Sequence, residues 1–560
     1  MSRIKRIDGF LDIPDKIVYT GYRIIRKEVK SQMDKKFLCS KSAPVVKTKA
    51  GKIRGFYFDG IYNFWGVRYA TAKRFEMPEP VKPWEGVKDA LAYGLVCPLL
   101  NEPTPGDEVS VPHRFWPAGE DCLNLDVWTN TIDPEAKKPV MVWFHGGGYS
   151  AGSAIEHIAY EGDNLARKHD VVMVGVNHRL NAFGHMDVSA FGERFKNSVN
   201  VGIADLVASL EWVRDNIVQF GGDPDNVTIF GQSGGGGKVT TLGQAPSADG
   251  LFHKAIVMSG VFPKNFGASF PEVDPEEFAK HIMEDLHVET IEELQKVNYR
   301  IFIMAVNRAQ RFFGKKGQIV SWAPHPNYWY AGDPLQVGFR EHYKQIPTIV
   351  GTCFSEFTGA PTEKEKAGMT PDEQREFVYA KYGKEKGEEL LALYENVYPG
   401  KNLCYAAAID YLTRPASVEY VRLKSEGDHA PAYEYLFDAE FDFDNGRTAW
   451  HCADIPFFFA NAERIPYCYS TPNCEELNRM MAESFTNFAK TGNPDAEGMP
   501  HWECSDGVHV PSMVFGLETK LRVDHDKELL ELAREIAPPF TFGSRKPKDD
   551  DEEEGRSWIY

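Results

Sequence analysis

The most informative segment of the chain reads Asn226-Val-Thr-Ile-Phe-Gly-Gln-Ser-Gly-Gly-Gly-Gly237. Its residues 227–230 are β-branched or aromatic, which is the composition of a buried strand, and glycines follow at once. Residues 231–235 match G-x-S-x-G, a strained strand-to-helix turn that carries a serine hydroxyl at the top of a sheet. The motif alone also fits a plain glycine-rich loop, so the prediction of such a turn at Ser233 depends on the rest of the chain.

The segments around this motif alternate between helical and strand patterns. Apolar residues recur every three or four positions between Ile203 and Phe220, which predicts one helix that Gly221 ends. Continuous apolar runs predict buried strands over residues 139–144, 171–177, 255–259, 347–351 and 432–437. This alternation favours an α/β fold with a mostly parallel central sheet and helices on both faces.

Composition limits the classes of protein and partner. The chain has 560 residues, 42% of them hydrophobic, with a formal net charge of −18. One large α/β domain with insertions can reach this length, and the negative charge argues against nucleic acid or an anionic membrane as a partner. The sequence offers no transmembrane run and no apolar signal-peptide core, so we expect a cytoplasmic protein, with non-classical export left open. Nine scattered cysteines do not suggest a full disulfide framework.

Three regions are predicted along the chain. Residues 1–43 form an N-terminal extension with weak amphipathic character, which could pack on the body or stay solvated. Residues 44–540 form the folded domain, which opens with a hairpin over residues 45–57. Residues 541–560 contain six consecutive acidic residues from Asp549 to Glu554, and we expect a solvated, disordered tail.

Residues 120–128 read Glu-Asp-Cys-Leu-Asn-Leu-Asp-Val-Trp. This segment closely resembles the E-D-C-L-x-L-x-V signature of the type B carboxylesterase and cholinesterase family. The resemblance implies an α/β-hydrolase fold whose loop insertions form a gorge. It also implies a disulfide between Cys97 and Cys122, which relatives use to close a loop at the gorge entrance. From the residues alone, the pair could equally remain as thiols in a reducing cytoplasm.

The strand predicted over residues 139–144 ends in His145-Gly-Gly-Gly-Tyr149. This motif matches the H-G-G-G oxyanion loop of esterases, and a plain glycine turn is the other interpretation. Acyl transfer places negative charge on the former carbonyl oxygen, and backbone donors must approach it without an intervening Cβ. We therefore assign the oxyanion hole to the N–H groups of Gly147, Gly148 and Gly234. His145 heads the loop, so we expect it to be structural.

The acid of a serine hydrolase with this fold should follow a strand after the nucleophile. The strand predicted over residues 347–351 ends at Gly351, and Glu356 lies five residues beyond that glycine. The resemblance gives this position to the catalytic acid, although Ser355 stands where relatives carry a second acidic residue. A solvated loop glutamate is the alternative for Glu356.

The catalytic histidine has to be chosen among sixteen histidines, so its position decides. His451 follows the strand predicted over residues 432–437 and begins a segment similar to the family's H-x-x-[DE]-I-P-F. His429 precedes that strand and would face the wrong end of the sheet. Asp454 is expected to support His451 or the pocket electrostatically.

Together the motifs resemble a serine carboxylic-ester hydrolase with the triad Ser233, His451 and Glu356. We expect an acyl-enzyme intermediate, a small to medium carboxylic ester as the small-molecule partner, and no metal or organic cofactor. A lipase or sterol esterase for long-chain esters is the alternative enzyme. A non-catalytic binding or adhesion protein is the alternative from another class, although such relatives usually lack the serine or the histidine. Gln232 replaces the commoner glutamate, which weakens a choline-ester interpretation.

Overall fold

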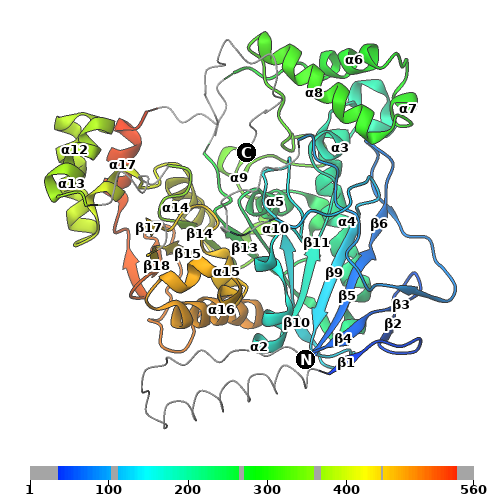
Figure 1. Cartoon of the computed structure of the whole chain (residues 1–560), viewed down its shortest axis with the longest axis horizontal. Coiled ribbons are helices and arrows are strands. Elements are labelled where there is room, and N and C mark those ends of the chain that lie inside the picture. The colour runs from blue at the N-terminus through cyan, green and yellow to red at the C-terminus, as the bar shows by residue number, and fades with distance from the viewer. Residues whose placement is uncertain are drawn as a thin grey trace, which may run out of the picture.

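The structure is a computed structural model, and it describes residues 36–101, 111, 113–263, 270–358, 368–442 and 446–538. A broad twisted sheet runs through the middle of the molecule, with helices on both sides (Figure 1). In order across this sheet, the strands are β1 (Phe37–Leu38), β4 (Phe56–Phe58), β5 (Ile61–Arg68), β9 (Asn124–Thr129), β11 (Val172–Val176), β10 (Lys138–Phe144), β12 (Gly222–Gln232), β13 (Lys254–Met258), β14 (Thr348–Cys353), β15 (Ala432–Phe437), β18 (Pro511–Phe515) and β19 (Lys520–Val523).

The strands from β11 to β18 in this order are parallel to their neighbours, whereas the outer strands pair antiparallel. The mostly parallel α/β sheet predicted from the sequence is therefore confirmed. Smaller sheets lie outside it and contain β2 (Val45–Lys47), β3 (Lys52–Arg54) and β8 (Val87–Asp89), then β6 (Ala70–Thr71) with β7 (Glu79–Pro80), and β16 (Glu440–Phe441) with β17 (Arg447–Thr448).

The helices alternate with the parallel strands along the chain, as the sequence pattern indicates. They are α2 (Asp163–His169), α3 (Asn181–His185), α4 (Val201–Asn216), α5 (Gly234–Gly243), α6 (Pro275–Asp285), α7 (Ile291–Leu294), α8 (Tyr299–Lys315), α9 (Pro334–Val337), α10 (Glu341–Lys344), α12 (Pro371–Tyr382), α13 (Lys384–Val397), α14 (Thr413–Lys424), α15 (Ile455–Phe458), α16 (Cys474–Thr491) and α17 (Lys527–Ile536). The pair α6 and α8 lies beyond the sheet, at the upper right of Figure 1.

The sheet separates two hydrophobic cores, and β10 contributes to both. Val142 and Phe144 point into one core, while Met141 and Trp143 point into the other. All four are fully buried. Successive side chains of a strand alternate between the two faces, so a strand covered on both sides must be apolar throughout.

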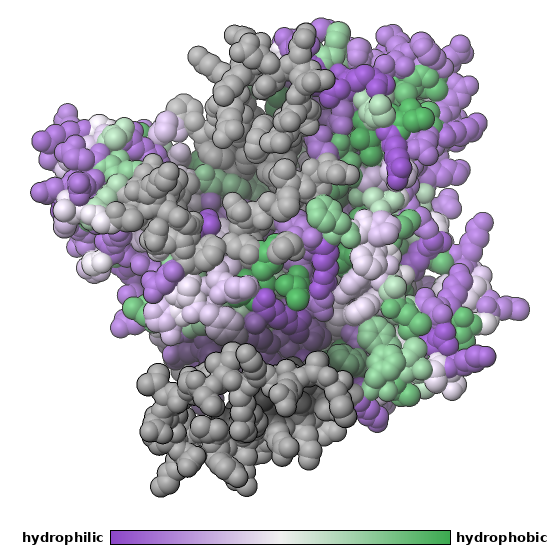
Figure 2. Space-filling view, in the orientation of Figure 1, coloured by the Kyte–Doolittle hydropathy of each residue, from purple (hydrophilic) through white to green (hydrophobic). Residues whose placement is uncertain are grey.

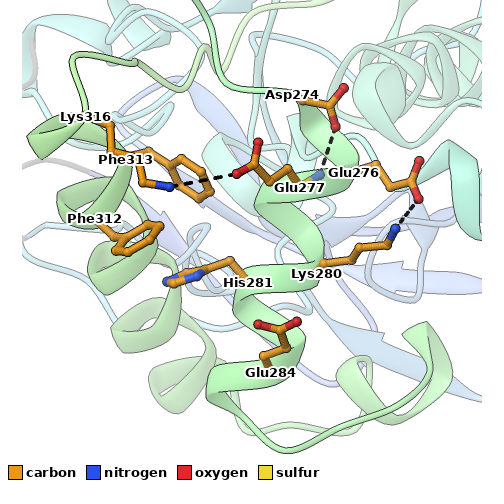
Figure 3. Close-up of a pocket in the computed structure, with 9 residues that line it drawn as sticks. All are labelled: Asp274, Glu276, Glu277, Lys280, His281, Glu284, Phe312, Phe313 and Lys316. Atoms are coloured by element: carbon orange, nitrogen blue, oxygen red, sulfur yellow. Dashed lines mark hydrogen bonds and ion pairs between the residues drawn. The ribbon is translucent and has the colours of Figure 1, made fainter.

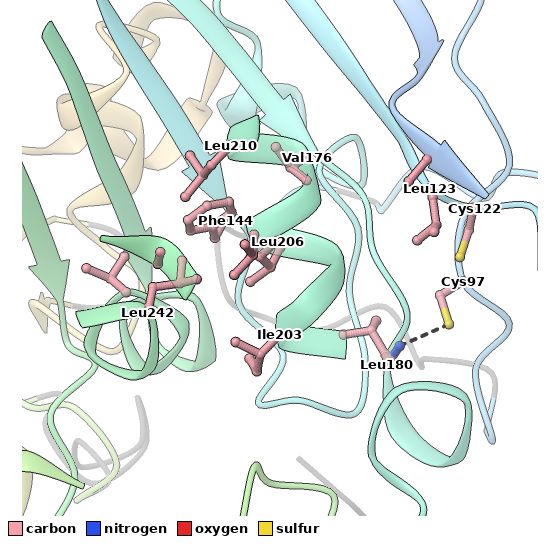
Figure 4. Close-up of a cluster of buried hydrophobic side chains, with 14 of the residues drawn as sticks. Cys97, Cys122, Leu123, Phe144, Val176, Leu180, Ile203, Leu206, Leu210 and Leu242 are labelled. Atoms are coloured by element: carbon pink, nitrogen blue, oxygen red, sulfur yellow. Dashed lines mark hydrogen bonds between the residues drawn. The ribbon is translucent and has the colours of Figure 1, made fainter. Parts of the chain in front are cut away.

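Helix α4 covers one face of the sheet next to the segment that contains Ser233. Its Leu206 and Leu210 lie against Phe144 of β10 and Val176 of β11 (Figure 4). The helix continues as a short 3₁₀ turn, and Gly221 ends it with a φ of 76°. On the opposite face, α16 packs against β10 and α2. The helix predicted from the spacing of apolar residues is thus confirmed, together with its glycine stop.

The first strand of the main sheet comes from within the expected N-terminal extension. Phe37 of β1 pairs with Phe58 of β4, so the sheet begins before residue 44. The predicted hairpin over residues 45–57 is present as the antiparallel pair β2 and β3, after which β4 joins the main sheet. The amphipathic pattern before residue 36 and the acidic tail at 541–560 lie outside the described residues.

Hydrophilic residues cover much of the described surface in Figure 2. In the described part of the chain, no helix combines the length and the apolar character needed to cross a bilayer. The cytoplasmic location stays a prediction from the sequence.

Arg414 anchors α14 through a buried ion network. Its side chain is 2% exposed and lies 2.7 Å from Glu434 of β15 and 2.5 Å from Asp526, just before α17. The Arg414→Ala variant should lower the free energy of unfolding by about 3–5 kcal/mol, because it leaves two carboxylates buried without their cation.

Urea unfolding measures this effect, with Arg422→Ala as the control on the same helix. Arg422 forms ion pairs with Glu419 and Glu426 in a more exposed place. The Arg422→Ala variant should therefore lower the free energy of unfolding by less than about 1 kcal/mol. Equal losses in the two variants would contradict a stabilising network at Arg414.

Candidate active site

A strained turn joins β12 to α5 and carries Ser233. The serine has a φ of 58° and a ψ of −127°. Its N–H donates to the carbonyl of Met258 at 2.8 Å, and its own carbonyl accepts from Gly237 N–H at 3.0 Å. Such a conformation persists only when its surroundings hold it, and it costs about 1–3 kcal/mol. The hydroxyl-bearing residue therefore sits in a constrained turn at the carboxyl end of β12.

Neighbouring backbone leaves room only for glycine on either side of this turn. A Cβ on Gly235 would lie 2.0 Å from the carbonyl oxygen of Phe144, and one on Gly231 would lie 2.4 Å from the carbonyl carbon of Gly235. Both contacts are with backbone atoms, which cannot move aside like a flexible side chain. The two outer glycines of G-x-S-x-G thus have a steric explanation.

The glycine loop after β10 lies directly against the start of α5. Gly147 and Gly148 have φ values of 85° and 65°. A Cβ on Gly234 would lie 2.1 Å from the carbonyl oxygen of Gly148. The three glycines predicted to donate to an oxyanion therefore lie close together at the N-terminal end of α5, where peptide dipoles favour negative charge. Their role in catalysis stays a prediction.

The structure brings Glu356 and His451 together. One carboxylate oxygen, Oε2, contacts Nδ1 of the imidazole. The other, Oε1, accepts hydrogen bonds of 2.6 Å from the Ser259 hydroxyl and from the Cys353 N–H. The Glu356 side chain is fully buried, whereas that of His451 is 16% exposed. The carboxylate is thus fixed by three donors, and the second imidazole nitrogen, Nε2, faces away from it.

The contact between His451 and Ser233 is not formed. Among the described residues, none hydrogen-bonds the Ser233 hydroxyl, and Nε2 of His451 instead lies 3.3 Å from the side-chain amide nitrogen of Gln232. The amide oxygen of Gln232 accepts from the Cys452 thiol at 3.2 Å. Because Gln232 immediately precedes Ser233, the imidazole lies next to the serine turn. Catalytic hydrogen bonds are often long without substrate and tighten when it binds.

Residues 42–531 match the family model described as the carboxylesterase family. The chain belongs to the carboxylesterase family. The matched residues include both glycine motifs, the Glu356–His451 pair and every strand of the main sheet except β1. The membership predicted from residues 120–128 is confirmed, as is the assignment of an esterase with the α/β-hydrolase fold.

Curated carboxylesterases and solved esterase structures are similar to nearly the whole chain. Para-nitrobenzyl esterase of Bacillus subtilis is 31% identical over 86% of this chain and 96% of its own length. Phenmedipham hydrolase of Pseudarthrobacter oxydans is 29% identical over 89% and 98%. A solved esterase from anaerobic Clostridium hathewayi, described as able to hydrolyse aliphatic aromatic polyesters, is 43% identical with a TM-score of 0.85, covering 90% of this chain and all of that one.

Two further carboxyl groups lie buried close to Glu356 in this carboxylesterase. Asp454 accepts from the Tyr435 hydroxyl at 2.7 Å, and Asp410 accepts from the Arg414 N–H at 2.7 Å. Burial, and then the nearby charge of Glu356, raises the pKa of each to about 6. Negative charge therefore accumulates around Glu356 as the pH rises past about 6, and the charge of Asp454 acts on His451 as well.

The Asp454→Asn variant should move the acidic limb of the kcat/KM profile to lower pH. Ionised Asp454 favours the protonated imidazole, whereas a neutral asparagine does not, so His451 would lose its proton more readily. Asparagine can still accept from Tyr435, so we expect a loss of at most about tenfold near pH 8. Rates on p-nitrophenyl acetate between about pH 5 and 8 measure the shift; a limb at its wild-type position would contradict an electrostatic role.

Aromatic side chains flank the Glu356–His451 pair and the start of α5. The ring of Phe357 lies 4.2 Å from the imidazole of His451, centroid to centroid, and 6.5 Å from the ring of Phe262. Tyr149 lies over the start of α5, because a Cβ on Gly237 would come within 2.7 Å of its hydroxyl oxygen. Aromatic side chains thus lie beside the imidazole of His451 and beside the first turn of α5.

Cys97 and Cys122 are both buried and both are free thiols in the structure. Their sulfur atoms face each other in Figure 4, where Cys97 also accepts a hydrogen bond from the Leu180 N–H. The neighbouring Cys97, together with burial, raises the pKa of the Cys122 thiol. The pair is close, as the resemblance implies, and the disulfide itself stays a prediction.

A pocket of about 460 Å³ lies between α6 and α8 (Figure 3). Charged residues and two phenylalanines line it, and His281 stacks on Phe312 at 4.3 Å. Lys280 forms an ion pair with Glu276, one turn earlier in α6. These helices supply none of the predicted catalytic residues, so this pocket is separate from the candidate active site.

The sequence motifs did not reveal every residue that contacts the candidate site. Phe357 follows Glu356 directly, so its place beside His451 could have been inferred from that adjacency. Asp410 belongs to no motif and reaches the site only through folding. Gln232 was noted for its lost charge, but its contact with His451 had no signal in the sequence.

Proposed function

We propose that this carboxylesterase hydrolyses its substrate with a catalytic triad of Ser233, His451 and Glu356. The contact between Glu356 and His451 beside the strained serine turn is the observation that carries the proposal. A carboxylate at Nδ1 keeps a proton there and leaves Nε2 free to accept the serine proton. The imidazole has to turn from the Gln232 amide toward the Ser233 hydroxyl when substrate binds.

Acylation and deacylation then follow in two steps. His451 takes the hydroxyl proton as the Ser233 oxygen bonds to the ester carbonyl carbon, and Glu356 stabilises the imidazolium. The carbon–oxygen bond to the alcohol breaks, and the alcohol leaves with the proton from His451. Water next gives a proton to His451 and attacks the acyl-enzyme, and the acid leaves as Ser233 regains its proton.

The N–H groups of Gly147, Gly148 and Gly234 would bind the oxyanion in both steps. Their close arrangement at the N-terminal end of α5 supports this role, because fixed donors need not reorganise as charge develops. Loss of one such donor typically lowers turnover by about 100- to 1000-fold.

The substrate we propose is a small to medium carboxylic ester that carries an aromatic group. The rings of Phe357 and Phe262 near His451 support this class, since aromatic surfaces favour aromatic partners. The names of the relatives, which include a para-nitrobenzyl esterase and an esterase acting on aliphatic aromatic polyesters, support it as well.

Two assays test the proposal. A fluorophosphonate probe should label Ser233 in the folded protein, and no labelling would overturn the triad. A p-nitrophenyl series from acetate to palmitate, with the benzoate included, should favour the short and aromatic acyl groups. A preference for palmitate would instead favour the lipase or sterol esterase.

A further inference from the structure

A buried lysine links the serine turn to the glycine loop. Lys238 lies in α5, five residues after Ser233, and its side chain is completely buried. Its Nζ donates a hydrogen bond of 2.8 Å to the carbonyl oxygen of His145, which heads the loop with Gly147 and Gly148. A lysine is almost never fully buried without a reason in packing or function.

The contact lies where α5 and the loop already meet through their backbones. A Cβ on Gly235, three residues before Lys238, would lie 2.9 Å from the same His145 oxygen. Lys238 therefore reaches from α5 to the residue that heads the loop, two positions before the first of its proposed oxyanion donors. The side chain can both hold the loop and place a charge near it.

Few groups around Lys238 compensate its charge. Glu156, which follows the loop, and Cys97 favour the ammonium, but burial outweighs them and lowers the pKa of Lys238 to about 7. The histidines that face it are His145, His178 after β11 and His185 in α3, and burial with the nearby lysine lowers the pKa of each. These histidines thus stay neutral, and Lys238 is the cation of the cluster.

We propose that Lys238 is a positioning residue of the ester hydrolysis proposed above: its ammonium holds the His145 carbonyl and adds positive potential near the oxyanion donors. A charge in a low-dielectric surrounding acts strongly on a developing oxyanion. The neutral amine can still donate to His145, but it gives no such potential. The charged form is present below about pH 7 and is lost as the pH rises, so the assistance fades with rising pH.

The test compares kcat of wild-type protein and Lys238→Met on p-nitrophenyl acetate between about pH 6 and 9. We expect the ratio of the wild-type rate to the variant rate to be about tenfold larger near pH 6 than near pH 9, where the ammonium charge is gone and only the lost hydrogen bond to His145 separates the two proteins. Both proteins carry the same proposed triad and the same Asp454, so the pH dependence that these residues bring largely cancels in this ratio. A ratio that does not change with pH would overturn the proposal.

Lys424→Met is the matched control. Lys424 is also fully buried, and burial lowers its pKa to about 7. Its Nζ donates to the backbone carbonyls of Tyr343 at 2.9 Å, Ile346 at 2.8 Å and Lys344 at 3.4 Å. It lies at the end of α14, away from the glycine loop. Its substitution should lower stability as Lys238→Met does while leaving the pH dependence of kcat unchanged.

A second variant separates charge from anchoring. Lys238→Gln is neutral but can still donate to His145, so its kcat should depend on pH in the same way as that of Lys238→Met; wild-type rates near pH 6 would overturn the role of the charge. If neither variant folds, the wild-type kcat profile decides, because it should fall through a midpoint within about one unit of pH 7. A profile still rising at pH 9 would also overturn the proposal.

These outcomes are distinct from a failure of the proposed function. A wild-type protein that resists the fluorophosphonate probe at Ser233 and does not hydrolyse p-nitrophenyl acetate contradicts the triad itself. An active wild-type protein whose pH profile matches that of Lys238→Met contradicts only the role of Lys238.

Discussion

The Ser233→Ala variant is expected to lower kcat on p-nitrophenyl acetate by about 10⁴- to 10⁶-fold, the range typical when a serine nucleophile is removed. Alanine has no hydroxyl, so no acyl-enzyme can form, and only binding and the backbone donors remain. The positive φ of Ser233 strains alanine and serine alike, so the fold should survive the change. Stopped assays of kcat and KM measure the loss.

Ser425→Ala is a suitable control for this variant. Ser425 ends α14 and donates to the carbonyl of Val421, far along the chain from the serine turn. The fluorophosphonate probe should label wild-type protein and Ser425→Ala equally, and Ser233→Ala not at all. Residual activity above about a tenth in Ser233→Ala would mean that another group carries the chemistry.

Local sterics explain why much of the fold could be predicted from the sequence. β10 is apolar at every inward position on both faces, and α4 repeats its apolar residues with the helical period, so each pattern has one satisfactory structure. The outer glycines of the serine turn are required by backbone contacts with Phe144 and Gly235, which any chain with this turn must make.

Elements that depend on distant partners could not be predicted. β12 begins at Gly222, earlier than its apolar run, because Lys138 of β10 pairs with Gly222 across a register shift. β1 has only two residues and exists because Phe37 meets Phe58. Short or turn-like segments have no strand pattern in their sequence, so only their pairing with a distant strand makes them part of a sheet.

The same limit applies to the candidate site. The order of the motifs nominated Glu356 and His451, and these two side chains do meet. The contact of Gln232 with His451, the buried Asp410 and the link from Lys238 to the glycine loop all arise from packing between segments. A motif gives the order of residues along the chain, but not which neighbour fills the remaining space.

The Glu356→Gln variant should lower kcat by about 10³- to 10⁴-fold with little change in KM, because it disturbs the imidazole without removing binding contacts. Cys353 N–H can only donate, so the amide oxygen of glutamine must keep the place of Oε1. Its NH₂ group then faces Nδ1 of His451. Nδ1 would have to accept, the proton would move to Nε2, and that nitrogen could no longer take the proton of Ser233.

Asp454→Asn makes the same chemical change at another buried carboxyl near the imidazole, so the pair of variants separates the two acids. Asp454 contacts the Tyr435 hydroxyl rather than His451, and asparagine can keep that contact. If the kcat of Asp454→Asn fell by about 10³-fold while that of Glu356→Gln stayed within about tenfold of the wild-type value, Asp454 would be the acid that orients the histidine. The direct contact of Glu356 with Nδ1, and the two donors fixing its other oxygen, lead us to expect the opposite order.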